Sequence, residues 1–284
     1  MDGGMLQFLA APFVASLILT GIHAYLGVHV VERGVIFVDL SLAQIAAFGA
    51  TIAILLPMSN GDPHAPMVYW VSLAFTFLGA FVFSTIRSKR ARIPQEAIIG
   101  ICYAVASAAA ILAMSKATSE SEHLKDMLVG NILAVSWPEV GHTAFLYAAV
   151  GIFHYIFRHK FLAISMNHEK AEASGLNVKL WDFLFYASFG FVVTSSVAIA
   201  GVLLVFCYLI VPSVAAILYS EHIGRRLAIG WTMGTVVSAL GIFLSVKLDL
   251  PTGATMVCTF GLVLILMALV RPLIQRNGVS GAPL

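Results

Sequence analysis

An all-α bundle of membrane-spanning helices is the fold class that the sequence predicts, and three observations predict it. Hydrophobic residues make up 60% of the 284 residues and charged residues only 11%, while the mean hydropathy of +0.95 lies outside the range of water-soluble domains. Apolar runs long enough to cross a bilayer as helices recur along the chain. The period-two alternation of a membrane β-barrel does not occur, so the spans are expected to be helical.

The apolar runs define roughly eight to ten spans, with about nine favoured. They cover 8–30, 35–57, 67–86, 94–115, 139–157, 182–200, 202–219, 227–247 and 253–270. The division between the sixth and seventh runs depends on Gly201 alone, and the fifth run contains His142 and His154, so counts of eight and ten stay open. No connection is long enough to be a domain, and residues 1–284 are expected to form one transmembrane domain.

Basic residues in the short connections predict the orientation, because cytoplasmic loops carry an excess of Lys and Arg. Under the favoured count, most of the 16 Lys and Arg residues fall on one side, and only Lys116, Lys125 and Lys247 fall on the other. The basic side receives Arg33, Arg87, Lys89, Arg90, Arg92, Arg158, Lys160, Lys170, Lys179, Arg225, Arg226, Arg271 and Arg276. This side is expected to be cytoplasmic, with the N-terminus outside and the C-terminus inside.

One long polar segment, residues 161–182, lies between apolar spans on the predicted cytoplasmic side. Asn167 can cap a short helix, Glu169 then falls in its first turn, and Gly175 supplies a stop. A helix within 162–180 would offer a partner the side chains of His168, Glu169, Lys170 and Glu172. The alternative is an ordinary solvated loop.

The chain lacks the chemistry of an ATPase. It has no G-x-x-x-x-G-K-[ST] phosphate-binding motif, so it is not expected to be an enzyme or to hydrolyse ATP by itself. Its three cysteines, Cys102, Cys207 and Cys258, lie in apolar spans, where free Cys behaves as a small hydrophobic residue. The sequence therefore predicts no disulfide, no thiolate metal cluster and no permanently bound cofactor.

Five segments, taken in order, resemble the manganese/zinc/iron permease family of ABC importers. They read LGVHVVERGVIFVDLSLAQIAAFGA, PQEAIIGICYA, LVGNILAVSWPEV, FLAISMNHEKAEASGLNVKLW and SVAIAGVLLVFCYLIVPSVAAILYS. Each is weak alone, but their order is that of the family, and the resemblance extends over nearly the whole chain.

The resemblance implies a fold like that of a type II ABC importer permease and a cargo that is a divalent transition metal, zinc first and manganese or iron next. It implies a homodimer in the lipid of the bacterial inner membrane, with no nucleic-acid partner. Each copy would dock one ATPase subunit through a coupling helix that contains Asn167, Glu169, Lys170, Glu172 and Gly175. A periplasmic or lipoprotein metal-binding protein would deliver the ion from outside.

The second span departs from the family pattern. The family usually has an Asp-Ala-Leu-Ser-His-Ala run, in which the Asp and the His share one helix face as a cation site. This chain reads VDLSLAQIAAFG, and alignment on Gly49 puts Gln44 at the His position and Leu40 at the Asp position, with Asp39 one residue early. The family's ligand pair therefore does not carry over intact.

Asp39 is still the strongest candidate for the ion path, because a carboxylate within a span is costly and points to a cation or a buried partner. Ser41 and Gln44 share a helix face and offer further oxygen atoms. If the first two spans form an antiparallel hairpin, His23 reaches a similar depth, where neutral imidazole could ligate zinc. The alternatives are an Asp39–Arg33 ion pair, a hydrogen bond from Asp39 to a neighbouring helix, and a His23 that only packs.

Pro212 lies inside an apolar span, where proline removes a backbone hydrogen bond and permits a bend. It is a candidate hinge or gate, although many intramembrane prolines are merely tolerated. Two rival functions stay open. One is a permease for a metal chelate or cobalamin, and the other is an ion-gradient-driven secondary transporter, which would need no cytoplasmic docking helix.

Overall fold

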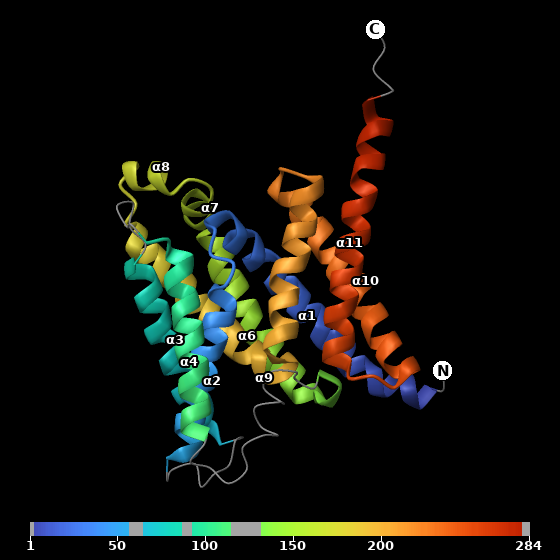
Figure 1. Cartoon of the computed structure of the whole chain (residues 1–284), viewed down its shortest axis with the longest axis horizontal. Helices are drawn as coiled ribbons and strands as arrows, with labels where there is room; N and C mark the ends of the chain where they lie inside the picture. Colours follow the sequence, from blue (N-terminus) through green and yellow to red (C-terminus); the bar gives the residue numbers. More distant parts are fainter. Residues whose placement is uncertain (1–2, 57–64, 87–92, 115–131, 280–284) are drawn as a thin grey trace. The chain divides into compact units, whose positions relative to one another are not determined.

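The computed structural model describes residues 3–56, 65–86, 93–114 and 132–279, and every regular element in these ranges is helical (Figure 1). The elements are α1 (Gly3–Arg33), α2 (Val38–Leu55), α3 (Pro66–Ile86), α4 (Gln95–Met114), η2 (Ile132–Ala134), α6 (Trp137–Ile156), α7 (Arg158–Met166), α8 (His168–Ala173), α9 (Val178–Tyr219), α10 (Ile223–Leu248) and α11 (Thr252–Val279). The predicted all-α class is confirmed. The basic residues 87–92, Lys116 and Lys125 lie outside the described ranges.

Within those ranges, seven helices are long and apolar enough to cross a membrane, or eight if α6 and α7, which are bent by 74°, count as one span. The favoured count of nine follows only when α9 is divided at Gly201. A straight helix of 42 residues would be about 63 Å long, roughly twice the thickness of the hydrocarbon core. Gly201 breaks this length, because its backbone angles (φ 75°, ψ 161°) are not helical.

The chain divides into two compact units, each built from segments that are far apart in sequence. Unit 1 contains residues 1–28, 131–140 and 203–284, and unit 2 contains residues 29–130 and 141–202. The chain therefore passes from one unit to the other within α1, within α6 and within α9.

In unit 2, helix α2 packs against both α3 and α4. Phe37 precedes α2 and has no side-chain cap of its own, but the Glu96 carboxylate of α4 accepts its backbone N–H at 3.0 Å. On the α3 side, the Ser72 hydroxyl donates to the Ala46 carbonyl at 2.7 Å. These contacts fix the rotation of α2, which carries the predicted ion-path residues.

In unit 1, the first part of α1 lies very close to the second part of α9. A Cβ atom added at Gly27 would lie 2.0 Å from the Leu209 carbonyl oxygen, so only glycine permits this approach. The Ser213 hydroxyl donates to the Leu209 carbonyl at 2.9 Å and lies 3.4 Å from the Ala24 carbonyl. The backbones of these two helices are therefore in direct contact.

Substitution of Gly201 by alanine is expected to destabilise the protein. The backbone at Gly201 occupies a region that is essentially restricted to glycine, and a Cβ there would add roughly 1–3 kcal/mol of strain. Thermal unfolding in detergent should show a lower midpoint. Gly151→Ala is the matched control, because Gly151 is helical and a Cβ there meets nothing within 4 Å. Equal midpoints for the two variants would contradict the expectation.

Candidate functional site

The polar segment folds into two short helices at one end of unit 2 (Figure 1). The Asn167 side chain accepts a hydrogen bond from the Lys170 backbone N–H at 2.9 Å and so caps α8. Gly175, with φ 83°, ends α8: its N–H bonds to the Glu172 carbonyl at 3.0 Å, and the Leu176 N–H bonds to the Ala171 carbonyl at 3.3 Å. This pair of bonds is a Schellman motif. A short helix thus lies where the sequence predicts one.

Helix α8 is amphipathic. Ala171 is buried in a small apolar cluster with Ile164 and Val178, which come from α7 and α9. The side chains of Glu169, Lys170 and Glu172 are exposed. An exposed charged surface on a well-fixed short helix is suited to protein docking, but the coupling role itself stays a prediction.

A buried polar cluster, which the sequence did not reveal, lies in the same unit. The Arg33 guanidinium donates to the Asp182 carboxylate at 2.6 Å and to the Ser165 hydroxyl at 2.9 Å. The side chains of Arg33 and Asp182 are 0% and 1% exposed. Nδ1 of His29 lies 2.8 Å from the same Ser165 hydroxyl. We call Arg33, Ser165, Asp182 and His29 the Arg33 cluster.

The Arg33 cluster overturns the alternative in which Arg33 neutralises Asp39. Arg33 pairs with Asp182, which is 149 positions away in sequence. One signal could have found this pair: Arg33 and Asp182 both lie at span ends on the predicted cytoplasmic side, and so at a similar membrane depth.

The ion-path candidates of α2 are buried. Asp39 is 1% exposed, Ser41 is 0% and Gln44 is 8%. Among the residues that the structure describes, neither carboxylate oxygen of Asp39 has a hydrogen-bond partner, and the Ser41 hydroxyl has none either. Within the described residues, the alternative of a hydrogen bond from Asp39 to a neighbouring helix is therefore not observed. A carboxylate that is buried without a partner is costly and suits a cation that binds transiently.

His23 belongs to unit 1, whereas Asp39 belongs to unit 2. The His23 side chain is fully buried, and its Nδ1 lies 2.9 Å from the Leu19 carbonyl oxygen. A carbonyl can only accept, so Nδ1 carries the proton and Nε2 holds the lone pair that a metal would need. The pairing of His23 with Asp39 stays a prediction.

Pro212 lies in the part of α9 that belongs to unit 1, and the helix continues through it. A Cβ at Gly230 of α10 would lie 3.6 Å from the Pro212 Cβ, so α9 and α10 approach each other closely here. The close contact places Pro212 within packed helices, and its hinge role stays a prediction.

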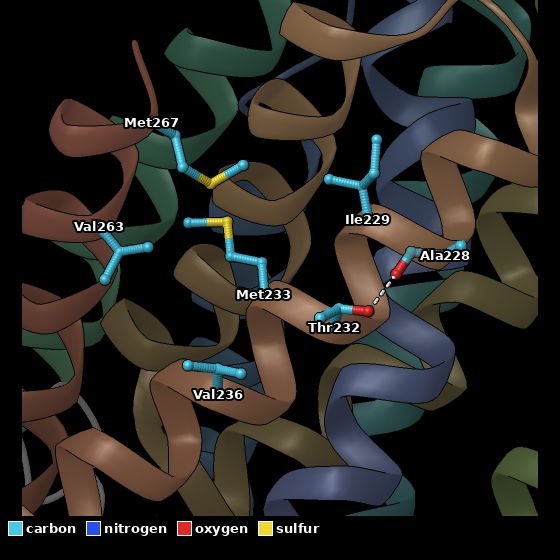
Figure 2. Close-up of a pocket in the computed structure, with 7 residues that line it drawn as sticks. All are labelled: Ala228, Ile229, Thr232, Met233, Val236, Val263 and Met267. Carbon is cyan, nitrogen blue, oxygen red and sulfur yellow. Dashed lines mark hydrogen bonds between the residues drawn. The ribbon is translucent and has the colours of Figure 1, made fainter. Parts of the chain in front are cut away.

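An apolar groove of about 380 Å³ lies between α10 and α11 of unit 1 (Figure 2). Its lining residues are Ala228, Ile229, Thr232, Met233, Val236, Val263 and Met267. The Thr232 hydroxyl already donates to the Ala228 carbonyl at 2.8 Å. The groove thus offers no charged ligand for a cation.

Within the described part of the chain, no three His, Cys, Asp or Glu side chains come together to hold a metal ion. A resident metal centre is therefore not formed by these residues.

Three comparisons with known proteins identify what this chain is similar to. The family described as the ABC 3 transport family matches residues 5–271. A manganese transport system membrane protein, MntC, of Listeria monocytogenes is 24% identical over 95% of this chain and 93% of its own length. A chelated iron transport system membrane protein, YfeC, of Yersinia pestis is 24% identical over 89% of this chain and 86% of its own length. The structure of PsaBC from Streptococcus pneumoniae in complex with Fab matches with a TM-score of 0.76 and 22% identity over 92% of this chain and 90% of that chain, which shows a shared fold.

Proposed function

Because this chain belongs to the ABC 3 transport family, we propose that it is the multi-pass permease subunit of an importer for a divalent transition metal in the bacterial cytoplasmic membrane. The family match, which runs from residue 5 to residue 271, carries the proposal. In the working transporter, two copies enclose the path, an ATPase subunit docks on α8 of each copy, and an external binding protein delivers the metal. The metal is cargo rather than a cofactor.

The donor atoms favour manganese over zinc, which reverses the order expected from the sequence. Gln44 stands where the family usually has His, so the polar side chains of the first two turns of α2, which are Asp39, Ser41 and Gln44, are all oxygen donors. Oxygen donors suit manganese, whereas zinc prefers nitrogen and sulfur. The relatives described as manganese and iron transport proteins support the same order.

A metal chelate is the second candidate cargo, because one relative is described as a chelated iron transport protein. Competition for the uptake of radioactive manganese into proteoliposomes distinguishes the two cargoes. Free manganese should reduce this uptake and a ferric chelate should not if the cargo is the free ion. The same vesicles test the energy source. ATP-dependent uptake supports the proposal, whereas uptake that persists without ATP and stops when ion gradients collapse would identify a secondary transporter.

Removal of the charges of α8 by Glu169→Ala, Lys170→Ala and Glu172→Ala is expected to weaken docking of the ATPase. All three side chains are exposed, so the folded permease should keep its thermal stability. Affinity for the ATPase should fall at least about tenfold, the equivalent of roughly 1.4 kcal/mol, and uptake should fall with it. Copurification of the two subunits and proteoliposome uptake measure the two effects.

The control is Lys247→Ala, which removes an exposed charge at the end of α10, on the predicted outer side. It should change neither docking nor uptake. Normal docking of the triple variant would refute the assignment of α8 as the ATPase contact.

A further inference from the structure

The Arg33 cluster connects three helices through a single guanidinium. Arg33 is the last residue of α1, Ser165 belongs to α7, and Asp182 belongs to the first turns of α9. The Arg33 Nε donates to the Ser165 hydroxyl at 2.9 Å, and Nη1 donates to the Asp182 carboxylate at 2.6 Å. All three residues belong to unit 2. One planar group therefore holds α7 and α9 at fixed distances from the end of α1.

Ser165 is the member of the cluster that belongs to the docking segment. It lies two residues before Asn167, the cap of α8, and next to Ile164, which packs on Ala171 of α8. Ser165 itself is only 4% exposed, because its hydroxyl points into the cluster rather than toward water. A displacement of α8 therefore acts on the Ser165–Arg33 hydrogen bond through two residues of chain and one apolar contact.

The Arg33 cluster is expected to move as a unit when Ser165 is displaced. The Arg33 guanidinium lies over the Phe185 ring, with its Cζ 3.9 Å from the ring centroid, which adds a cation–π contact and excludes water. In these surroundings an unpaired charge is costly, so Arg33 and Asp182 must move together. Any motion of Ser165 that preserves its hydrogen bond carries both charges with it.

Two of the three helices that the Arg33 cluster connects, α1 and α9, also lead out of unit 2. The chain continues from unit 2 into unit 1 within α1, between Val28 and His29, and within α9, between Val202 and Leu203. The second crossing follows directly after Gly201, where α9 is not helical. The Arg33 cluster thus contacts α1 and α9 in the parts of these helices that belong to unit 2, while their other parts belong to unit 1.

We propose that Ser165 and Arg33 form the mechanical link between the docking helix and the spans: movement imposed on α8 passes through Ser165 and Arg33 to Asp182, and so to α1 and α9. This role rests on the proposed function, because it requires an ATPase that moves α8. Ser165 and Arg33 are positioning residues, since neither needs to touch the transported metal.

Ser165→Ala tests the link, because it removes the hydroxyl and leaves the Arg33–Asp182 ion pair in place. The permease should assemble with the ATPase and hydrolyse ATP at nearly the normal rate. Metal transported per ATP hydrolysed should fall at least about tenfold, because the hydrogen bond to the charged Arg33 guanidinium is lost together with the Ser165–His29 contact. Arg33→Lys should act in the same direction, because lysine can pair with Asp182 but lacks the fork that reaches Ser165 as well. Ser165→Thr, which keeps a hydroxyl, should restore most of the coupling.

Ser188→Ala is the matched control. Ser188 is also buried in unit 2, and its hydroxyl lies 2.8 Å from Nε2 of His154, whose ring stacks on Phe161 of α7. Ser188 belongs to α9 and, among the described residues, makes no hydrogen bond to Arg33 or to α7. It should keep the normal ratio of transport to hydrolysis. Equal losses in Ser165→Ala and Ser188→Ala, or a normal ratio in both Ser165→Ala and Arg33→Lys, would overturn the link. A wild-type complex without ATP-dependent uptake would instead refute the proposed function, and the link with it.

Discussion

Metal uptake is expected to be lost when Asp39 is replaced by asparagine, although the protein should remain at least as stable as the wild type. The asparagine keeps the shape of the side chain and removes its charge. Transport should fall at least about 100-fold, the equivalent of roughly 2.8 kcal/mol of lost stabilisation of the ion. Radioactive manganese uptake into proteoliposomes measures this effect.

The expected effect on stability has the opposite sign to that of a broken ion pair. Neither oxygen of Asp39 has a hydrogen-bond partner among the described residues, so Asp39→Asn breaks no hydrogen bond there and removes an uncompensated buried charge from the first turn of α2. Asp182→Asn, by contrast, breaks the pair with Arg33 and should lower the unfolding temperature. If Asp39→Asn transported metal normally, the ion-path assignment would be wrong; if it unfolded like Asp182→Asn, Asp39 would be structural.

The largest loss of stability is expected from Arg33→Met. It leaves the Asp182 carboxylate buried without its cation, which typically costs about 3–5 kcal/mol. Thermal unfolding in detergent and the yield of monodisperse protein should both fall. The double variant Arg33→Met with Asp182→Leu should recover most of the loss, because removal of both members of a buried pair is often neutral.

The control is Arg158→Met. Arg158 lies at the start of α7, and its guanidinium bonds to the Tyr155 carbonyl at 3.1 Å near the surface. Loss of this contact should change stability little, because exposed contacts of this kind contribute about 0–1 kcal/mol. A double variant that was no more stable than Arg33→Met would show that the cluster stabilises the fold by packing rather than by charge.

The features that the sequence predicted well depend on neighbouring residues. The cap at Asn167 and the stop at Gly175 are separated by about two helical turns, and each is a local rule of backbone hydrogen bonding. The break at Gly201 is local too, since a lone glycine between two long apolar runs marks a change of backbone direction. Hydropathy predicts the spans because the length and apolar character of each span must match the hydrocarbon core of the bilayer, whatever its neighbours are.

The features that the sequence did not predict depend on how helices are rotated and paired. Arg33 and Asp39 are six positions apart, and this proximity suggests an ion pair, yet the guanidinium bonds to Asp182. Apolar periodicity could not show this, because spans that are apolar all round carry almost no signal of which face meets which helix. The hairpin argument for His23 predicts how deep in the membrane this residue lies. It does not predict the unit to which His23 belongs.

The ion pair of unit 2 also sets an order of events during synthesis. Arg33 is made 149 residues before Asp182, an interval of roughly 7–30 s at about 5–20 residues per second. During this time α1 has its terminal arginine but not its carboxylate, so the side chain must extend to the water at the membrane face. Unit 2 can close only after α9 has been inserted. A nascent chain that stalls before α9 therefore keeps a charged helix end that has not yet been buried.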